Sequence, residues 1–89
     1  MIKKKVKITN KLGLHARAAA KFVHLSNRYA SSVRIDKEGN VVDGKSILGI
    51  LTLAAVQGSE ITLIVSGKDE KEALEALVAL IEDIFTEEE

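Results

Sequence analysis

A histidine follows a glycine turn and opens a helical pattern near the N-terminus. The segment reads Gly13-Leu14-His15-Ala16-Arg17, and residues 16–28 then carry a continuous apolar side at helical spacing. Gly13 permits a tight turn, so we expect His15 at the N-cap or first helical position, beside N–H groups without intrahelical partners. Those donors, the helix dipole and the Arg17 guanidinium favour an anion. A nucleophilic imidazole there predicts a phosphate-carrying histidine; from position alone, a surface or capping histidine is the alternative.

The composition indicates a small cytoplasmic domain. The chain has 89 residues, 46% hydrophobic and 29% charged, which predicts one domain over residues 1–89 with a modest core. It contains no cysteine, so neither disulfides nor cysteine-ligated metal is expected, and we predict no cofactor. The lysine-rich start is not followed by the apolar stretch of a signal peptide, and no run is long enough to span a membrane.

The net charge of zero conceals a split between the two halves of the chain. Residues 1–45 carry 11 Lys/Arg and 3 Asp/Glu, a net +8, whereas residues 46–89 carry 2 and 10, a net −8. His15 lies in the basic half, which suits a phosphate or an acidic partner surface. Only 3% of residues are aromatic and no nucleic-acid-binding motif occurs, so we expect no nucleic acid partner.

Hydrophobic periodicity predicts seven elements in the order βαββαβα. We expect strands at residues 2–8, 32–36, 41–42 and 61–66, and helices over residues 16–28, 46–57 and after the turn at 67–69. Ser46 is the expected N-cap of the second helix, and Gly58 is expected at its C-terminal end. The last helix should bury Leu74, Leu77, Val78, Ile81 and Ile84 or Phe85. The pattern indicates helices on one side of a mostly antiparallel sheet, whose open face takes Lys3, Lys5, Lys7 and Arg34.

The first two helices are predicted to form a docking surface. At 100° per residue, Lys21, His24 and Arg28 fall within about 40° of Arg17 and form a basic stripe, for which an ordinary solvated face is the alternative. His24 has no partner at metal-ligand spacing, so we expect no metal there. The second helix is apolar nearly all round, and we expect Ile47, Leu48 and Leu51 to point outward. A basic stripe beside an apolar patch suits a protein partner.

A phosphate-loop pattern occurs by coincidence. Residues 39–46 match G-x-x-x-x-G-K-[ST] between a predicted strand and helix. However, Val41 and Val42 favour a strand, and the chain is too short for the parallel α/β core that houses such loops. The strand at residues 61–66 also lacks the terminal aspartate that helps to hold magnesium. We therefore reject nucleotide binding.

Three segments in this order of elements carry a specific resemblance: Gly13-Leu14-His15-Ala16-Arg17, Lys45-Ser46-Ile47-Leu48-Gly49-Ile50 and Gly58-Ser59-Glu60-Ile61. Over essentially its whole length the chain resembles HPr, the histidine-containing phosphocarrier family of the bacterial phosphoenolpyruvate-dependent phosphotransferase system. The resemblance implies an α+β open-faced β-sandwich, in which three helices cover one face of a four-stranded antiparallel sheet.

The resemblance also implies roles for individual residues. His15 would accept a phosphoryl group on Nδ1 from enzyme I and pass it to an EIIA-type acceptor, as a stoichiometric carrier and not an enzyme. Arg17 and the N–H groups of Ala16 and Ala18 would stabilise the phosphate. Ser46 would be the serine that HPr kinase/phosphorylase modifies in some bacteria, with plain helix capping as the alternative. A carrier of this kind is expected to be a monomer.

One residue departs from the family pattern. The family commonly reads His-x-Arg-Pro, whereas this chain has Ala18, which restores a backbone N–H that proline lacks. We hypothesise that this N–H donates to Nδ1 of unphosphorylated His15, or to the phosphate afterwards. His-Ala-Arg-Ala also resembles a proteobacterial or nitrogen-branch relative, so a sugar-transport role does not follow from the resemblance. A regulatory relative that works by binding is the alternative function, although it would not need to keep His15.

Overall fold

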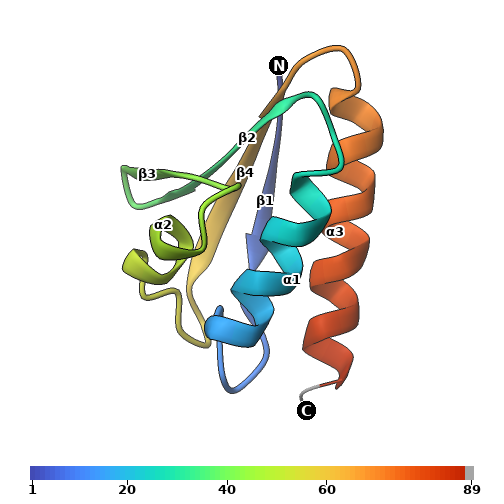
Figure 1. Cartoon of the computed structure of the whole chain (residues 1–89). Coiled ribbons are helices and arrows are strands. Elements are labelled where there is room, and N and C mark those ends of the chain that lie inside the picture. The colour runs from blue at the N-terminus through green and yellow to red at the C-terminus, as the bar shows by residue number, and fades with distance from the viewer. Residues whose placement is uncertain (88–89) are drawn as a thin grey trace.

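The computed structural model describes residues 1–87, apart from the side chains of Phe85 and Glu87. The elements are β1 (Ile2–Lys7), α1 (Ala16–Ser26), β2 (Ser32–Lys37), β3 (Asn40–Asp43), α2 (Ile47–Thr52), β4 (Glu60–Ser66) and α3 (Glu70–Glu87), shown in Figure 1. The predicted βαββαβα order is confirmed, and so is the α+β open-faced sandwich. The four strand predictions hold to within one residue at every end.

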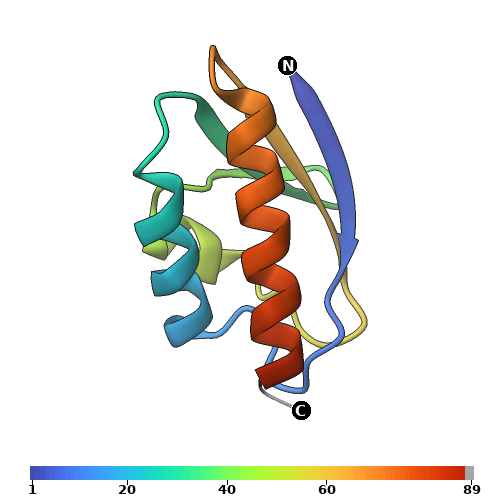
Figure 2. The same ribbon diagram turned by 90° about the vertical axis from the view of Figure 1, so that its right-hand side faces the viewer.

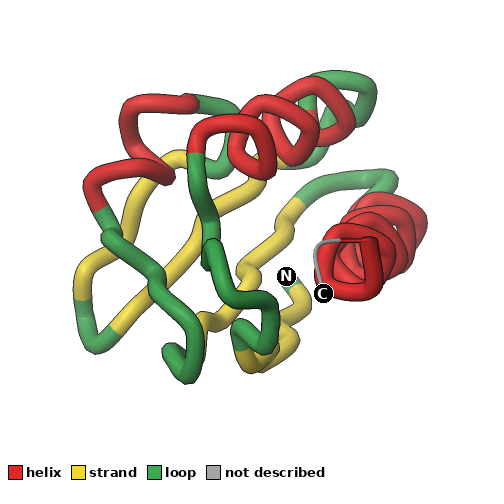
Figure 3. The backbone as a smooth tube through the Cα atoms, turned by 90° about the horizontal axis from the view of Figure 1, so that it is seen from below, coloured by secondary structure: helices red, strands yellow, loops and turns green. Residues whose placement is uncertain are grey.

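The four strands form one antiparallel sheet in the order β1-β4-β2-β3. The helices lie on one side of it, which Figure 3 shows from below. Side chains alternate between the two faces: Val33, Ile35, Ile61, Leu63 and Val65 are buried toward the helices. Lys3, Lys5, Lys7 and Arg34 are exposed, as predicted for an open face.

The core lies between the sheet and the helices. Helices α1 and α3 run side by side in opposite directions (Figure 2) and contact each other. Phe22 from α1 and Leu77, Ile81 and Ile84 from α3 are almost fully buried. This confirms the predicted apolar face of the last helix, with Leu74 and Val78 packed at its margin. The side chain of Phe85, the alternative to Ile84, lies outside the described residues.

Helix α1 ends at Ser26, two residues before the predicted end at Arg28. The chain tightens there, since Arg28 N–H donates to Leu25 O at 3.0 Å and Tyr29 N–H to Ser26 O at 3.2 Å. The Ser26 hydroxyl is buried within 2.9 Å of the carbonyl oxygens of both Phe22 and Gly44. A bond from the last helical residue to the β3–α2 connection ties the helix end to the fold.

Helix α2 is much shorter than predicted, because it ends at Thr52 and not near Gln57. Ala54 has a left-handed backbone with φ of 50°, which takes the chain out of the helix. The next residue, Ala55, is buried, and its carbonyl accepts the N–H of Leu14 at 2.9 Å. This bond to a distant loop prevails over the helical preference of the apolar run. Gly58 does not cap the helix; it lies in a later turn, where its N–H donates to Ile8 O at 2.7 Å.

The start of α3 is fastened to the loop that follows α1. The Asp69 carboxylate accepts the N–H groups of Ala30 and Ser31, each at 2.9 Å, and also the Ser31 hydroxyl. The bond from the Ser31 hydroxyl, followed by that from the Ala30 N–H, lowers the pKa of Asp69 below its ordinary value. Asp69 therefore joins the two long helices at the end of the molecule opposite His15.

Candidate functional site

His15 is the N-cap of α1, as predicted. Its backbone is extended, with φ of −77° and ψ of 178°, and its carbonyl accepts the N–H of Ala19 at 2.8 Å. The half-buried side chain makes no capping hydrogen bond to the first turn. The N–H groups of Ala16, Arg17 and Ala18 precede the first helical bond, so they have no intrahelical acceptor.

The first alternative of the Ala18 hypothesis, in which the Ala18 N–H donates to Nδ1 of unphosphorylated His15, is therefore wrong. An N-cap side chain stabilises a helix when it accepts the N2 or N3 amide, and Ala18 supplies the N3 amide here. The His15 side chain makes no such bond, so Ala18 N–H does not donate to the unphosphorylated ring. Donation from Ala18 N–H to a phosphoryl group on His15 stays a prediction.

The loop before His15 is held from two sides. Buried Asn10 donates from Nδ2 to Gly13 O at 3.0 Å, and Ala55 O accepts from Leu14 N–H at 2.9 Å. Gly13 has φ of 65°, and a Cβ on it would lie 2.4 Å from Ala55 O and 2.9 Å from the Cα of Val56. A side chain at position 13 would thus collide with fixed backbone, so only glycine fits the turn that delivers His15.

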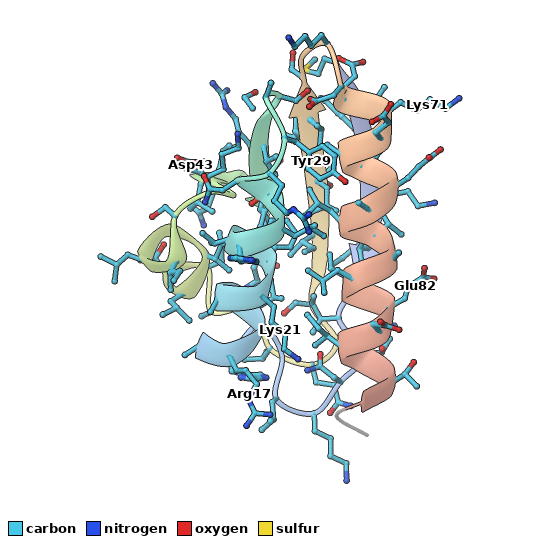
Figure 4. All side chains as sticks on the ribbon, turned by 45° about the vertical axis from the view of Figure 1, so that its right-hand side comes forward. Arg17, Lys21, Tyr29, Asp43, Lys71 and Glu82 are labelled. Atoms are coloured by element: carbon cyan, nitrogen blue, oxygen red, sulfur yellow. The ribbon has the colours of Figure 1, made fainter. Side chains whose placement is uncertain are left out.

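The basic side chains predicted along α1 are exposed. Arg17 and Lys21 lie on successive turns at the N-terminal end of α1, and Tyr29 lies beyond its other end (Figure 4). His24 is exposed within the helix, and Arg28 is exposed just after it. The structure thus places Arg17, Lys21 and His24 on the helix, but Arg28 belongs to the turn that follows.

An exposed apolar patch lies on α2, and we define it as Ile47, Leu48 and Leu51. Their side chains are 41%, 77% and 37% exposed, which confirms the predicted outward residues, while Ile50 on the same helix is fully buried. Ala16 and Ala20 are exposed on α1, which packs against α2.

Two further exposed apolar residues escaped sequence reasoning. Leu12 and Val56 are each more than 60% exposed, and the backbone of Val56 meets Gly13 directly. The predicted helix through Gln57 concealed Val56, because it placed this residue in regular structure away from the His15 loop. The Gly13 turn was the available signal, since it requires a close backbone neighbour.

Ser46 is the N-cap of α2, as predicted. Its backbone is extended, with φ of −122° and ψ of 119°, and its hydroxyl accepts the N–H of Gly49 at 3.1 Å. The side chain is half-buried and lies directly before the apolar patch. A structural role for this serine is therefore present in the unmodified protein.

The structure also bears on nucleotide binding, metal binding and membrane insertion. Residues 40–43 of the phosphate-loop pattern form strand β3, so they do not wrap a phosphate, in agreement with its rejection. Among the described residues, no group of three His, Asp or Glu side chains is placed to hold a metal ion. No helix within residues 1–87 is long and apolar enough to cross a membrane.

The arrangement suits a reversible phosphoryl acceptor. A half-buried imidazole stands at a helix start whose first N–H groups lack intrahelical acceptors, and an exposed arginine follows two residues later; both features favour a dianion. The site lies on the surface next to apolar side chains, where a second protein has access.

Comparison with known proteins agrees with this geometry. The family model described as the PTS HPr component phosphorylation site matches residues 2–83. The phosphocarrier protein HPr of Cupriavidus necator is 48% identical over 89 residues, the whole of both chains. The HPr-like protein Crh of Halalkalibacterium halodurans is 51% identical over 82 residues, covering 92% of this chain and 98% of that protein. The crystal structure of HPr-C-His from Thermoanaerobacter tengcongensis has a TM-score of 0.91 at 43% identity, covering 97% of each chain.

The family match includes the His15 helix start, the Ser46 helix and all four strands. The fold, the strand order and the sequence identity all indicate the same family. The chain belongs to the HPr family of the phosphotransferase system, whose members carry phosphoryl groups and are not themselves enzymes.

Proposed function

We propose that this chain accepts a phosphoryl group on Nδ1 of His15 from phosphorylated enzyme I and passes it to an EIIA-type acceptor. The observation that carries the proposal is an N-cap histidine whose side chain does no capping. The first turn of α1 thus keeps its donors for an incoming anion.

The transfer needs a neutral imidazole as nucleophile. Nδ1 of His15 attacks the phosphorus, a new N–P bond forms, and the N–P bond to the donor histidine of enzyme I breaks, leaving that imidazole with the electron pair. The N–H groups of Ala16 and Ala18 and the Arg17 guanidinium stabilise the charge on the phosphoryl oxygens. The same step in reverse order, with the acceptor's nucleophile attacking, unloads His15. Positioning and charge neutralisation supply the rate, as in other phosphoryl transfers.

Both partners dock on the same surface in this proposal. The exposed cations Lys21, His24 and Arg28 steer an acidic partner, and the apolar patch Ile47, Leu48 and Leu51 forms the desolvated centre. A shared surface also explains how one carrier alternates between donor and acceptor without changing shape.

We propose a second, regulatory role for Ser46, as a substrate of an HPr kinase/phosphorylase. A phosphate at the start of α2 is tolerated by the helix dipole, but it places a dianion beside Ile47 and Leu48 and so opposes docking. The capping bond to Gly49 supports the alternative of a purely structural serine. Incubation with the kinase and ATP decides between them: Ser46→Ala should abolish labelling, and absence of labelling in the native chain would leave only the cap.

We further propose a monomeric cytoplasmic protein with a single domain over residues 1–89. The edge strand β1 carries Lys3, Lys4, Lys5 and Lys7, so two copies pairing along this edge would bring like charges together. Light scattering at micromolar concentration should give the mass of one chain. A mass of two chains would overturn the monomer.

The test of the carrier function mixes the protein with enzyme I and phosphoenolpyruvate. We expect one acid-labile phosphoryl group per chain and none in His15→Ala. Adding EIIA proteins of the sugar and nitrogen branches in turn should unload the carrier and identify its branch. A protein that stays unlabelled, yet binds a partner in a manner that Ser46 modification controls, would favour the regulatory alternative instead.

A further inference from the structure

A lysine at the end of strand β2 contacts the C-terminal end of helix α2. Lys37, the last residue of β2, lies two positions after buried Ile35 and so faces the helix layer. Its ammonium donates to the carbonyl oxygens of Leu53 at 3.2 Å and Ala54 at 3.4 Å. Carbonyls at the end of a helix lack intrahelical partners, and a cation there also complements the helix dipole.

The segment held by Lys37 has a backbone that alanine rarely adopts. Ala54 has φ of 50°, where its Cβ crowds the following carbonyl oxygen. A strained residue persists only where its surroundings fix it. Lys37 supplies such a constraint, because its two bonds span the peptide groups on either side of the Ala54 Cα.

The strained residue leads directly to the support of the phosphoryl site. Ala55 follows, and its carbonyl accepts the N–H of Leu14, the residue before His15. The contact is close, since even a Cβ on Gly13 would approach Ala55 O to 2.4 Å. A change in the position of the Ala55 peptide is therefore transmitted to the turn that delivers His15.

We propose that Lys37 is a positioning residue for His15, acting through Leu53, Ala54, Ala55 and Leu14. Its consequence for transfer rests on the proposed carrier function, whereas the link from Lys37 to Leu14 stands on the structure alone. In this proposal the Lys37 ammonium fixes the position of the Leu14 N–H, and through it the orientation of the His15 imidazole.

Hydrogen exchange of the Leu14 amide tests the link directly. Lys37→Met keeps the aliphatic stem and removes the ammonium, so we expect protection at Leu14 to fall about tenfold, as for the loss of a charged hydrogen bond. The Leu63 amide in the central strand β4 reports any global loss of stability. Lys37→Arg should retain protection at Leu14, and Lys5→Met, on the open sheet face, should leave it unchanged. Exchange at Leu14 that matches the native protein in Lys37→Met would overturn the proposal.

Rescue separates positioning from general support. Ala54→Gly removes the strain, so Lys37→Met combined with Ala54→Gly should recover most of the Leu14 protection. If Lys37→Met alone does not fold, Lys37→Gln, which keeps one donor, should show a smaller loss of the same kind.

Phosphoryl transfer from enzyme I gives the functional readout. At saturating phosphorylated enzyme I, we expect the transfer rate of Lys37→Met to fall about tenfold with little change in KM, since the patch residues Ile47 and Leu48 lie at the other end of α2. A native rate despite altered Leu14 exchange would refute the positioning role. Failure of the native protein to accept phosphate would instead refute the carrier function and leave the exchange result standing.

Discussion

Two helices of this protein begin with an extended N-cap residue, yet the two caps behave differently. At the start of α2, the Ser46 hydroxyl accepts the N–H of Gly49 at 3.1 Å. At the start of α1, the His15 side chain makes no such bond, although its carbonyl begins the helix in the same way. Helix α1 therefore lacks the stabilisation that a capping side chain supplies, which is about 1 kcal/mol in a typical helix.

The difference teaches how a surface site is made without a cavity. A helix start that is not capped retains donors for an anion, and a reactive side chain at the cap position stands beside them. The Gly13 turn and the Leu14–Ala55 bond then fix the backbone that a cap would otherwise help to fix. Stability and function have been assigned to different groups at α1, whereas Ser46 combines both at α2 in the proposed regulation.

The largest expected effect comes from giving α1 the same N-cap residue as α2, a serine. His15→Ser should abolish acid-labile phosphorylation completely, because a serine does not form a phosphoramidate. It should also raise the free energy of unfolding by up to about 1 kcal/mol, since the serine oxygen caps the first turn. Urea denaturation and a phosphorylation assay measure the two effects. Lower stability in His15→Ser would show that the contacts of the imidazole stabilise the fold more than a serine cap does.

A charged cap at the second start should separate capping from docking. Ser46→Asp keeps a good N-cap, so the unfolding free energy should stay within about 0.5 kcal/mol of the native value. The added negative charge beside Ile47 and Leu48 should weaken binding to enzyme I about tenfold, measured by titration calorimetry, and salt should reduce the difference. Ser66→Asp, at an exposed position on β4, is the matched control. Equal affinity of Ser46→Asp and the native protein would remove the docking role of this helix start.

Removal of the second cap should act on stability alone. Ser46→Ala should lower the free energy of unfolding by about 1 kcal/mol, because the Gly49 N–H loses its acceptor. Phosphoryl transfer to His15 in the folded protein should stay within about twofold of the native rate, because the His15 loop is held by Ala55 and Asn10. A large loss of transfer in Ser46→Ala would mean that the two starts are coupled.

The smallest effect concerns the start of α3, where Asp69 uses its carboxylate to hold the Ala30–Ser31 loop. Its pKa is lowered in the folded protein, so its contribution to stability is present above the unfolded carboxyl pKa of about 3.9 and is lost as the pH falls through the folded value. The urea midpoint of the native protein should therefore fall more steeply than that of Asp69→Asn between about pH 5 and pH 2. Asp83→Asn on α3 is the control, and identical pH profiles for native protein and Asp69→Asn would contradict the assignment.

Local sequence signals were sufficient for most of the fold. The alternation in residues 2–8 and 61–66, the Gly13 turn and the capping serine each describe structure within a few neighbouring residues, and each prediction is confirmed. The end of α2 is different, because it depends on Lys37 from β2 and on Leu14 from the His15 loop. Such long-range bonds have no signature in an apolar run that favours a helix.

The residues of the candidate site also divide into those that local spacing predicts and those that depend on long-range contacts. His15 at a helix start and the outward Ile47, Leu48 and Leu51 follow from spacing. The exposure of Val56 depends on where α2 stops, so it was hidden by the error in the helix end. The proposed bond from Ala18 to the resting imidazole failed because side-chain orientation at an N-cap is not fixed by residue order.

Amide chemical shifts during phosphorylation test the central claim most directly. The protein labelled with ¹⁵N is phosphorylated with enzyme I and phosphoenolpyruvate, and its amide spectrum is recorded before and after. We predict one phosphoryl group on Nδ1 of His15 and large downfield shifts of the Ala16, Arg17 and Ala18 amides, with the Gly49 amide little changed. Phosphate on another residue, or on His15 without shifts in the first turn of α1, would contradict a site built on an uncapped helix start.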